Sequence, residues 1–161
     1  LGRVTLRRPH QADDTPEQRA AKRDVNAFAT QAIKRIMDQN FSSLHRGADD
    51  LGPLFATPAD FREFRLVFDH DVLNEVREDR LIIEPLFAGV SFVEELAQPR
   101  GVFGKSGGVW RAVGSLDTVK VSAQDTYRHP TKFEMLITRT GDGYAISSLD
   151  LHVAKEPSAK L

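Results

Sequence analysis

The sequence contains no cysteine and no long hydrophobic run. The lack of cysteine in a chain of 161 residues excludes disulfide bonds, thiolate nucleophiles and cysteine-based metal sites. No window of about 18 apolar residues occurs, so no stretch is predicted to span a membrane. No secretory signal is visible, and the sequence begins with Leu rather than Met. We therefore expect an excised fragment, and a membrane anchor is one candidate for the part that preceded it.

The sequence also has no marked excess of positive or negative charge. The 22 Lys and Arg residues face 23 Asp and Glu residues, which gives a formal net charge of −1. Nucleic-acid-binding proteins normally carry a clustered basic surface, so this balance predicts no nucleic-acid partner. A chain of this length is most simply one domain, and it can bury enough surface to fold without a metal or disulfide staple.

A long amphipathic helix is predicted from Thr15 to Leu44. Thr15 can cap it, Pro16 takes the first helical position, and Gln18 completes a capping-box pattern. Gly47 offers the stop signal. Because the apolar stripe begins well inside the helix, we expect the opening turns to project from the body. Steps of three and four place these residues on one face: Val25, Phe28, Ala29, Ala32, Ile33, Ile36, Met37, Phe41 and Leu44.

A second helix is predicted to begin at Thr57-Pro58-Ala59-Asp60, where a cap, a proline and an acidic residue coincide. The charged segment Glu75–Arg80 should form its exposed end. Its apolar stripe consists of Phe61, Phe64, Phe68, Val72 and Val76, widened by Leu66, Val67 and Leu73.

Beyond Leu81 the hydrophobic period changes to two, which indicates strands. Bulges are expected near Pro85 and Gly89, and a phase shift near Ser115. Strands are predicted at 81–96, 109–123, 132–140 and 144–154, separated by a loop at 98–108, a polar turn at 124–130 and a tight hairpin at 141–143. One strand face is predicted to carry Trp110, Ala112 and Gly114, and another Phe133, Met135 and Ile137.

Helices placed ahead of an antiparallel meander predict an α+β fold. A long helix and a second helix packed on a curved sheet of three to four strands form the cone of NTF2-like domains. Glycines and bulges in long strands supply the curvature that such a sheet needs. We expect a flexible N-terminal tail at 1–14, the NTF2-like domain at 15–154 and a C-terminal tail at 155–161.

The triplet Asp69-His70-Asp71 is the most suggestive cluster of ionisable residues. Helical neighbours one and two positions apart do not share a face, so these side chains are not expected to form a compact dyad. We interpret the triplet as a solvated helix face.

Neither a metal site nor a phosphate site is expected. The glycine-rich stretch 101–108 lacks the Lys-Ser/Thr ending of a phosphate loop. Ser91, Ser115 and Ser147 lack the context of a nucleophile elbow. No two histidines lie three or four positions apart, which argues against a local metal site at His10, His45, His70, His129 or His152.

NTF2-like cones often hold a pocket, which leaves a small-molecule binder or an isomerase- or hydratase-type enzyme as an alternative. Such a site would need a carboxylate or histidine with a tyrosine donor opposite. Asp38, Tyr127 and Tyr144 are the candidates. The inward positions are mostly large and apolar, which favours a packed interior with Trp110 in the core.

Three motifs resemble one family. Residues 55–64 (Phe-Ala-Thr-Pro-Ala-Asp-Phe-Arg-Glu-Phe) are similar to the Phe-x-Thr-Pro-x-x-aromatic-x-x-Phe stretch of the DotI/IcmL/TraM proteins. Residues 108–112 resemble the glycine-then-Trp strand that follows the second helix in that family. Residues 143–146 resemble the opening of its last strand. The resemblance covers residues 24–153 and departs from the family in the longer, more basic segment 96–108.

The resemblance implies a non-catalytic assembly subunit of a type IVB secretion or conjugation apparatus. It implies a periplasmic domain of a bitopic inner-membrane protein, attached to the membrane only through the missing anchor. It further implies homo-oligomers, contacts with other subunits, and no catalytic, cofactor-binding or metal-binding residues. We expect docking at the sheet edge and at the opening turns of the long helix, since unpaired edges and projecting helices are natural contact elements.

Overall fold

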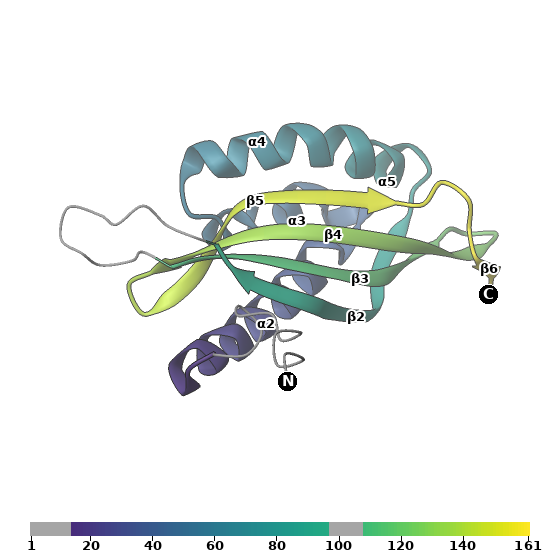
Figure 1. The fold of residues 1–161 in the computed structure, drawn as a ribbon. Coiled ribbons are helices and arrows are strands. Elements are labelled where there is room, and N and C mark those ends of the chain that lie inside the picture. The colour runs from purple at the N-terminus through teal and green to yellow at the C-terminus, as the bar shows by residue number, and fades with distance from the viewer. Residues whose placement is uncertain (1–13, 97–107) are drawn as a thin grey trace, which may run out of the picture.

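The computed structural model describes residues 14–96 and 108–161. These residues form a six-stranded antiparallel sheet with a long helix across one face and a second helical segment beside one edge (Figure 1). The strand order is β1-β2-β3-β4-β5, and β6 also pairs with β4. The α+β prediction is confirmed, with more strands than the three to four expected. The helices are α2 (Pro16–Ile36), α3 (Leu44–Asp49), α4 (Pro58–Phe68) and α5 (Asn74–Glu78); the strands are β1 (Gln39–Asn40), β2 (Ile82–Glu95), β3 (Val109–Val121), β4 (Thr126–Thr140), β5 (Gly143–Val153) and β6 (Ala159–Lys160).

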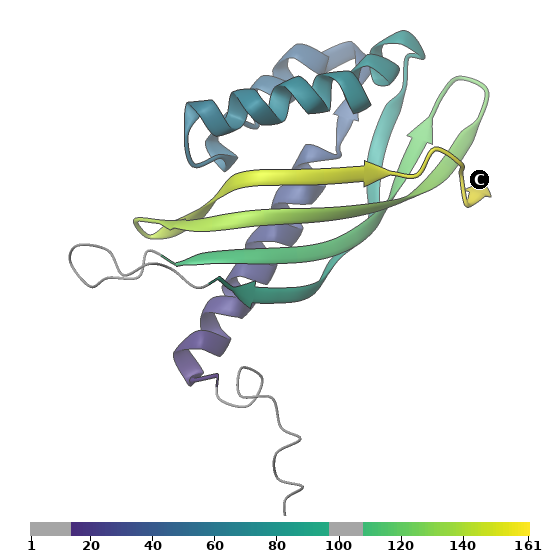
Figure 2. The same cartoon turned by 45° about the horizontal axis from the view of Figure 1, so that its top comes forward.

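Helix α2 begins as predicted. The Gln18 backbone N–H donates to Thr15 Oγ1 at 3.1 Å, and the Thr15 N–H donates to Gln18 Oε1 at 2.8 Å. This reciprocal capping box satisfies two of the donors that a helix start leaves open. No residue before Val25 in α2 is buried, and the start of the helix extends past the sheet in Figure 2.

The predicted continuation of this helix to Leu44 is wrong, because α2 ends at Ile36. Gln39–Asn40 instead form β1, which pairs with β2. The Asn40 side chain accepts the Ser42 N–H at 2.9 Å and starts a 3-10 turn. Such a local side-chain bond competes with helix continuation. The predicted stop at Gly47 is also wrong, since that glycine lies inside α3.

The second helix is interrupted by a π-helical turn at Asp69–Leu73, between α4 and α5. Thr57 caps it as predicted, with its Oγ1 accepting the Asp60 N–H at 3.0 Å. Leu66 and Val67 are 76% and 56% exposed, so the prediction that they widen the buried stripe is wrong. The buried positions of this segment are Phe64, Phe68, Val72, Leu73 and Val76.

The irregularity of the sheet belongs to β2 and β5. Bulges interrupt β2 between Leu86 and Gly89, as predicted, and again two residues later. The phase shift predicted near Ser115 is wrong, since β3 pairs with β4 without interruption from Val109 to Val121. The bulge needed for curvature therefore lies on the partner strand. The predicted strand faces are confirmed by the burial of Trp110, Ala112, Gly114, Phe133, Met135 and Ile137.

The prediction of a polar turn at 124–130 is wrong, because β4 already begins at Thr126. The turn is shorter, closed by the Ser122 N–H donating to the Asp125 carbonyl oxygen at 2.9 Å. Because β4 starts early, its first residues are available to pair with β6. The segment 155–161, expected as a tail, returns to pair beside β4 where β5 has ended. The predicted tail at 1–14 and loop at 98–108 lie almost wholly outside the described residues.

The conformation of Gly108 and its contact with Trp110 explain why one of the motifs has a glycine at this position. Its φ is +67°, a region that residues with a Cβ avoid. A Cβ there would lie 2.5 Å from Cη2 of Trp110. The indole, 2% exposed, therefore needs a glycine beneath it, and the prediction that Trp110 belongs to the core is confirmed.

Phe87 holds an unfavourable backbone at the first β2 bulge. Its φ is +56° and its side chain is 75% exposed, so the packing of the ring contributes little stability to offset the backbone strain. Replacing Phe87 by Asn, which tolerates the left-handed region, should raise the free energy of unfolding by about 1 kcal/mol. Phe92→Asn is the matched control, because Phe92 has an ordinary φ. Urea unfolding that shows no gain for Phe87→Asn over Phe92→Asn would contradict the strain.

Candidate protein-binding groove

The three candidate residues of the alternative, a catalytic pocket in the cone, are not brought together. Asp38 is exposed just after α2. Tyr127 lies on β4, opposite Lys160 of β6. Tyr144 lies on β5 and packs against Trp110, with ring centroids 5.6 Å apart. Each tyrosine thus has a structural neighbourhood of its own, and no acid–tyrosine pair forms among these three.

His70 and Asp71 do touch, which corrects the prediction that they could not. His70 Nδ1 lies 2.8 Å from Asp71 Oδ1. The π-helical turn explains this contact, because its wider winding changes which neighbours meet. Their side chains are 84% and 54% exposed, so the interpretation as a solvated face is confirmed.

The other ionisable side chains that the structure describes are not arranged as a metal centre. Among residues 14–96 and 108–161, no cluster of three or more His, Asp or Glu side chains has the geometry of a cation site. His129 is buried, with Nδ1 2.8 Å from the carbonyl oxygen of Ala154, so it ties the end of β5 to β4. His152 is exposed on β5 as expected.

A groove runs between α4 and the edge strand β5. Figures 1 and 2 show the helix lying alongside this strand. Two overlapping stretches of about 540 and 600 Å³ make up the groove. Its floor is apolar, formed by residues that line both stretches: Phe64, Val67, Leu149 and Leu151.

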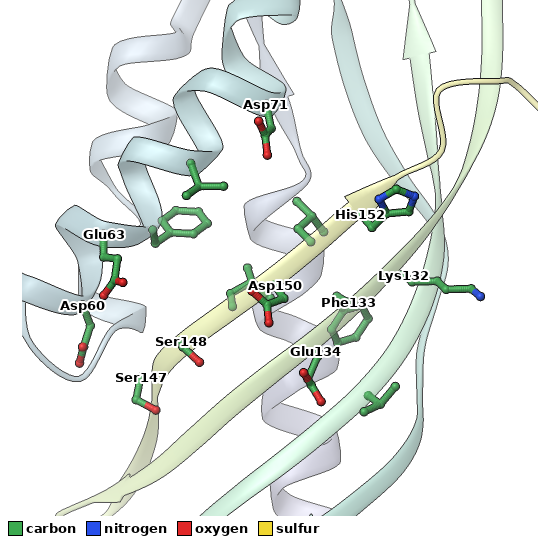
Figure 3. A pocket seen from close by; sticks show the side chains of 15 residues that line it. Asp60, Glu63, Asp71, Lys132, Phe133, Glu134, Ser147, Ser148, Asp150 and His152 are labelled. Atoms are coloured by element: carbon green, nitrogen blue, oxygen red, sulfur yellow. The ribbon is translucent and has the colours of Figure 1, made fainter.

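The rim of the first stretch is mostly acidic (Figure 3). Asp60 and Glu63 line it from α4, and Asp150 from β5; we call these three residues the acidic rim. None of the three forms an ion pair with any described residue. Lys132 and His152 are the basic lining residues of that stretch. The rim therefore favours a positively charged occupant.

Two arginines fix the surroundings of the rim. Arg65 Nη1 lies 2.9 Å from Asp49 Oδ1, and Arg65 Nε lies 3.2 Å from Asp69 Oδ1. Burial lowers the pKa of Arg65, but these two partners outweigh it, and the pKa lies above its ordinary value. On the sheet, hydrogen bonds to Glu134 and Glu94 raise the pKa of Arg111. Arg111 shares its single positive charge between Glu134 and Glu94, so Glu134 is only partly compensated, and the acidic rim adds to that negative charge.

The outer edge of β5 presents unpaired backbone groups. The Ala154 N–H donates to the Pro130 carbonyl oxygen at 2.8 Å, so Ala154 faces β4. Alternate residues of a strand point their N–H and C=O groups to opposite sides. Leu149, Leu151 and Val153 therefore direct theirs away from β4, and no backbone partner among the described residues meets them.

Sequence reasoning missed this groove. It treated Val67 as core, used Asp60 only as part of a helix start signal, and assigned no role to Glu63 or Asp150. Val67 follows Phe64 by three positions and therefore fits a helical apolar stripe, so the spacing gave no signal of its exposure. The pairing of α4 with β5, far apart in sequence, had no local signature.

Comparison with known proteins rests on structure alone. No protein-family model matches the sequence, and no curated protein is significantly similar to it. Three solved structures share the fold. An IcmL-like type IV secretion system protein from Legionella pneumophila subsp. pneumophila str. Philadelphia 1 has 13% identity and a TM-score of 0.65, covering 86% of this chain and 96% of that one.

The other two matches are of similar strength. The periplasmic domain of DotI has 19% identity and a TM-score of 0.64, over 88% of this chain and 98% of that one. A periplasmic fragment of TraM has 16% identity and a TM-score of 0.61, over 82% and 97%. The resemblance drawn from the three motifs is thus confirmed at the level of the fold, while the assignment to NTF2-like domains stays a prediction. This chain has the fold of the IcmL-like type IV secretion system protein, the periplasmic domain of DotI and the periplasmic fragment of TraM.

Proposed function

We propose that this chain is a non-catalytic subunit of a type IV secretion or conjugative transfer apparatus. In this role it faces the periplasm, belongs to an inner-membrane protein, and works through contacts with other subunits and with copies of itself. The observation that carries the proposal is the match over nearly the full length of an IcmL-like type IV secretion system protein, of the periplasmic domain of DotI and of a periplasmic fragment of TraM.

The packing of the interior supports a non-catalytic role. The interior is filled by one buried apolar cluster where α2 crosses the sheet. This cluster includes the fully buried side chains of Ile33 and Ile36 on α2 and of Met135 and Ile137 on β4. Catalysis needs ionisable groups that converge on an enclosed site. The candidates Asp38, Tyr127 and Tyr144 do not converge, and the main groove is an open one at the sheet edge. Contact with other proteins suits such a surface better than turnover does.

The experiment is deletion of the gene in the bacterium that encodes this chain, followed by measurement of plasmid or effector transfer to recipient cells. We expect transfer to be lost and to be restored by the wild-type gene. An Asp38→Asn, Tyr127→Phe double variant should restore transfer fully if catalysis plays no part. Transfer at the wild-type level in the deletion strain would refute the proposal.

Within the described residues, no helix combines the length and apolarity needed to cross a membrane.

A further inference from the structure

We propose that the groove between α4 and β5 binds an extended segment of a partner subunit, which adds to the sheet as a further strand. Side chains of that segment alternate between apolar and basic. The identity of the partner as another subunit of the apparatus rests on the proposed function. The binding mode rests only on the geometry of the groove.

The backbone of β5 is ready for strand addition over a defined length. At one end, the Ala56 N–H donates to the Ile146 carbonyl oxygen at 2.8 Å, which closes the edge there. A bulge follows between Ile146 and Ser148, opposite Leu136. Beyond it, Leu149, Leu151 and Val153 offer their outward N–H and C=O groups. An incoming strand that paired with them would satisfy these groups as a native neighbour does.

The alternation of side chains along β5 dictates the chemistry of the occupant. Leu149 and Leu151 lie opposite Met135 and Phe133 on the buried face of the sheet. Every second residue of an added strand would lie on that face, above the apolar floor and beside Val67. These positions call for apolar side chains, which would also cover Val67.

The intervening positions face solvent and negative charge. Ser148, Asp150 and His152 project from the opposite face of β5 and are exposed. Directly opposed residues of two strands interact, and opposite charges stabilise the pair. A basic residue facing Asp150 would gain such a partner, with Glu63 and Asp60 on the helix side (Figure 3). An acidic segment would meet repulsion at the same positions.

A bulge lies at one end of this edge and α4 lies alongside it, but the edge lacks two other devices that protect exposed strands. Natural edges carry prolines, inward-pointing charges or lysines that prevent pairing with other chains. Between Ser147 and Val153, β5 has no proline and no lysine. The acidic rim protects the edge selectively, because its negative charge attracts basic segments and repels acidic ones.

The test uses the full chain and a capped seven-residue peptide in which Arg and Val alternate. We expect the peptide to bind and to slow amide hydrogen exchange at Leu149, Leu151 and Val153. A peptide with Glu in place of Arg should bind at least about tenfold more weakly. A third peptide, N-methylated at alternate amides, keeps the charge but cannot pair, and should lose at least about tenfold in affinity.

Two variants of the chain complete the design. Asp150→Lys should weaken the Arg/Val peptide by about tenfold, since an attraction becomes a repulsion. Leu151→Pro removes an outward N–H without breaking a bond to β4 and should abolish binding. If Leu151→Pro fails to fold, the N-methylated peptide still decides the matter. Equal binding of the methylated and unmethylated peptides, or protection elsewhere, would overturn strand addition. Loss of peptide binding leaves the transfer assay untouched, so the two proposals fail separately.

Discussion

Replacing Gly114 by alanine is expected to unfold much of this protein under mild denaturing conditions. A Cβ at Gly114 would lie 2.3 Å from the Gly89 carbonyl oxygen and 2.6 Å from Cζ of Phe133. The first contact is with backbone, which cannot rotate away. Overpacking of a well-packed core costs about 1–3 kcal/mol when side chains alone must adjust, so we expect about 3 kcal/mol or more here.

The size of the effect follows from where Gly114 sits. It pairs with Val90 of β2 and Phe133 of β4, at the point where the two β2 bulges bring Gly89 against β3. Separating β2 from β3 to admit a methyl group would flatten the curve over which α2 lies. For a domain of this size, roughly 3 kcal/mol corresponds to a fall of about 10 °C in Tm. Thermal and urea unfolding followed by circular dichroism would measure both quantities.

Gly89→Ala is the matched control, because a Cβ at Gly89 meets no atom within 4 Å. Its φ lies outside the left-handed region. An alanine there should leave stability unchanged or raise it by about 0.5 kcal/mol, since it restricts the unfolded chain. Equal losses for Gly89→Ala and Gly114→Ala would mean that strand glycines are sensitive everywhere. The close approach of β2 and β3 would then not be the cause.

Local signals account for the parts of this fold that the sequence predicts well. Thr15 and Thr57 cap helices because their hydroxyls need only the next turn of backbone. The strand faces around Trp110 and Phe133 follow from a period of two that holds over whole strands. In each of these cases the information lies within a few residues, and the expected elements formed.

The failures arise where distant contacts outweigh local preference. Residues up to Leu44 keep helical spacing, yet Gln39 and Asn40 gain strand pairing with Ile82 and Ile83, and α2 stops before them. Ser115 was expected to mark a bulge, but the extra residue belongs to the neighbouring β2. Helical periodicity also cannot reveal the π-helical turn at Asp69–Leu73, although the burial of Val72 and Leu73 within it was predicted.

The candidate groove shows the same division. The need for some free sheet edge followed from the meander, and the edge was expected as a docking element. Which edge remains open could not be foreseen, because it depends on α4 lying beside β5 and on β6 covering part of β4. The acidic rim combines Asp60 and Glu63 with Asp150, three residues joined only by the tertiary fold.

Ile33→Ala is expected to cost about 3 kcal/mol, within the usual range of 2–5 for deleting a large buried aliphatic side chain. Ile33 is 0% exposed and lies at the centre of the buried face of α2. The helix packs mainly on β2, and cavities between a helix and a curved sheet close poorly because both surfaces are fixed by hydrogen bonds. Urea unfolding can be followed by the fluorescence of Trp110, the single tryptophan.

Leu66→Ala removes a comparable aliphatic group from the other helix and supplies the control. Leu66 also fits a helical apolar stripe, but it is 76% exposed on α4. Its truncation should change the free energy of unfolding by no more than about 0.5 kcal/mol. A difference of several kcal/mol between Ile33→Ala and Leu66→Ala would establish that the packing of α2 on the sheet forms the main core. Comparable losses for the two variants would contradict the assignment of Ile33 to the core and of Leu66 to the surface.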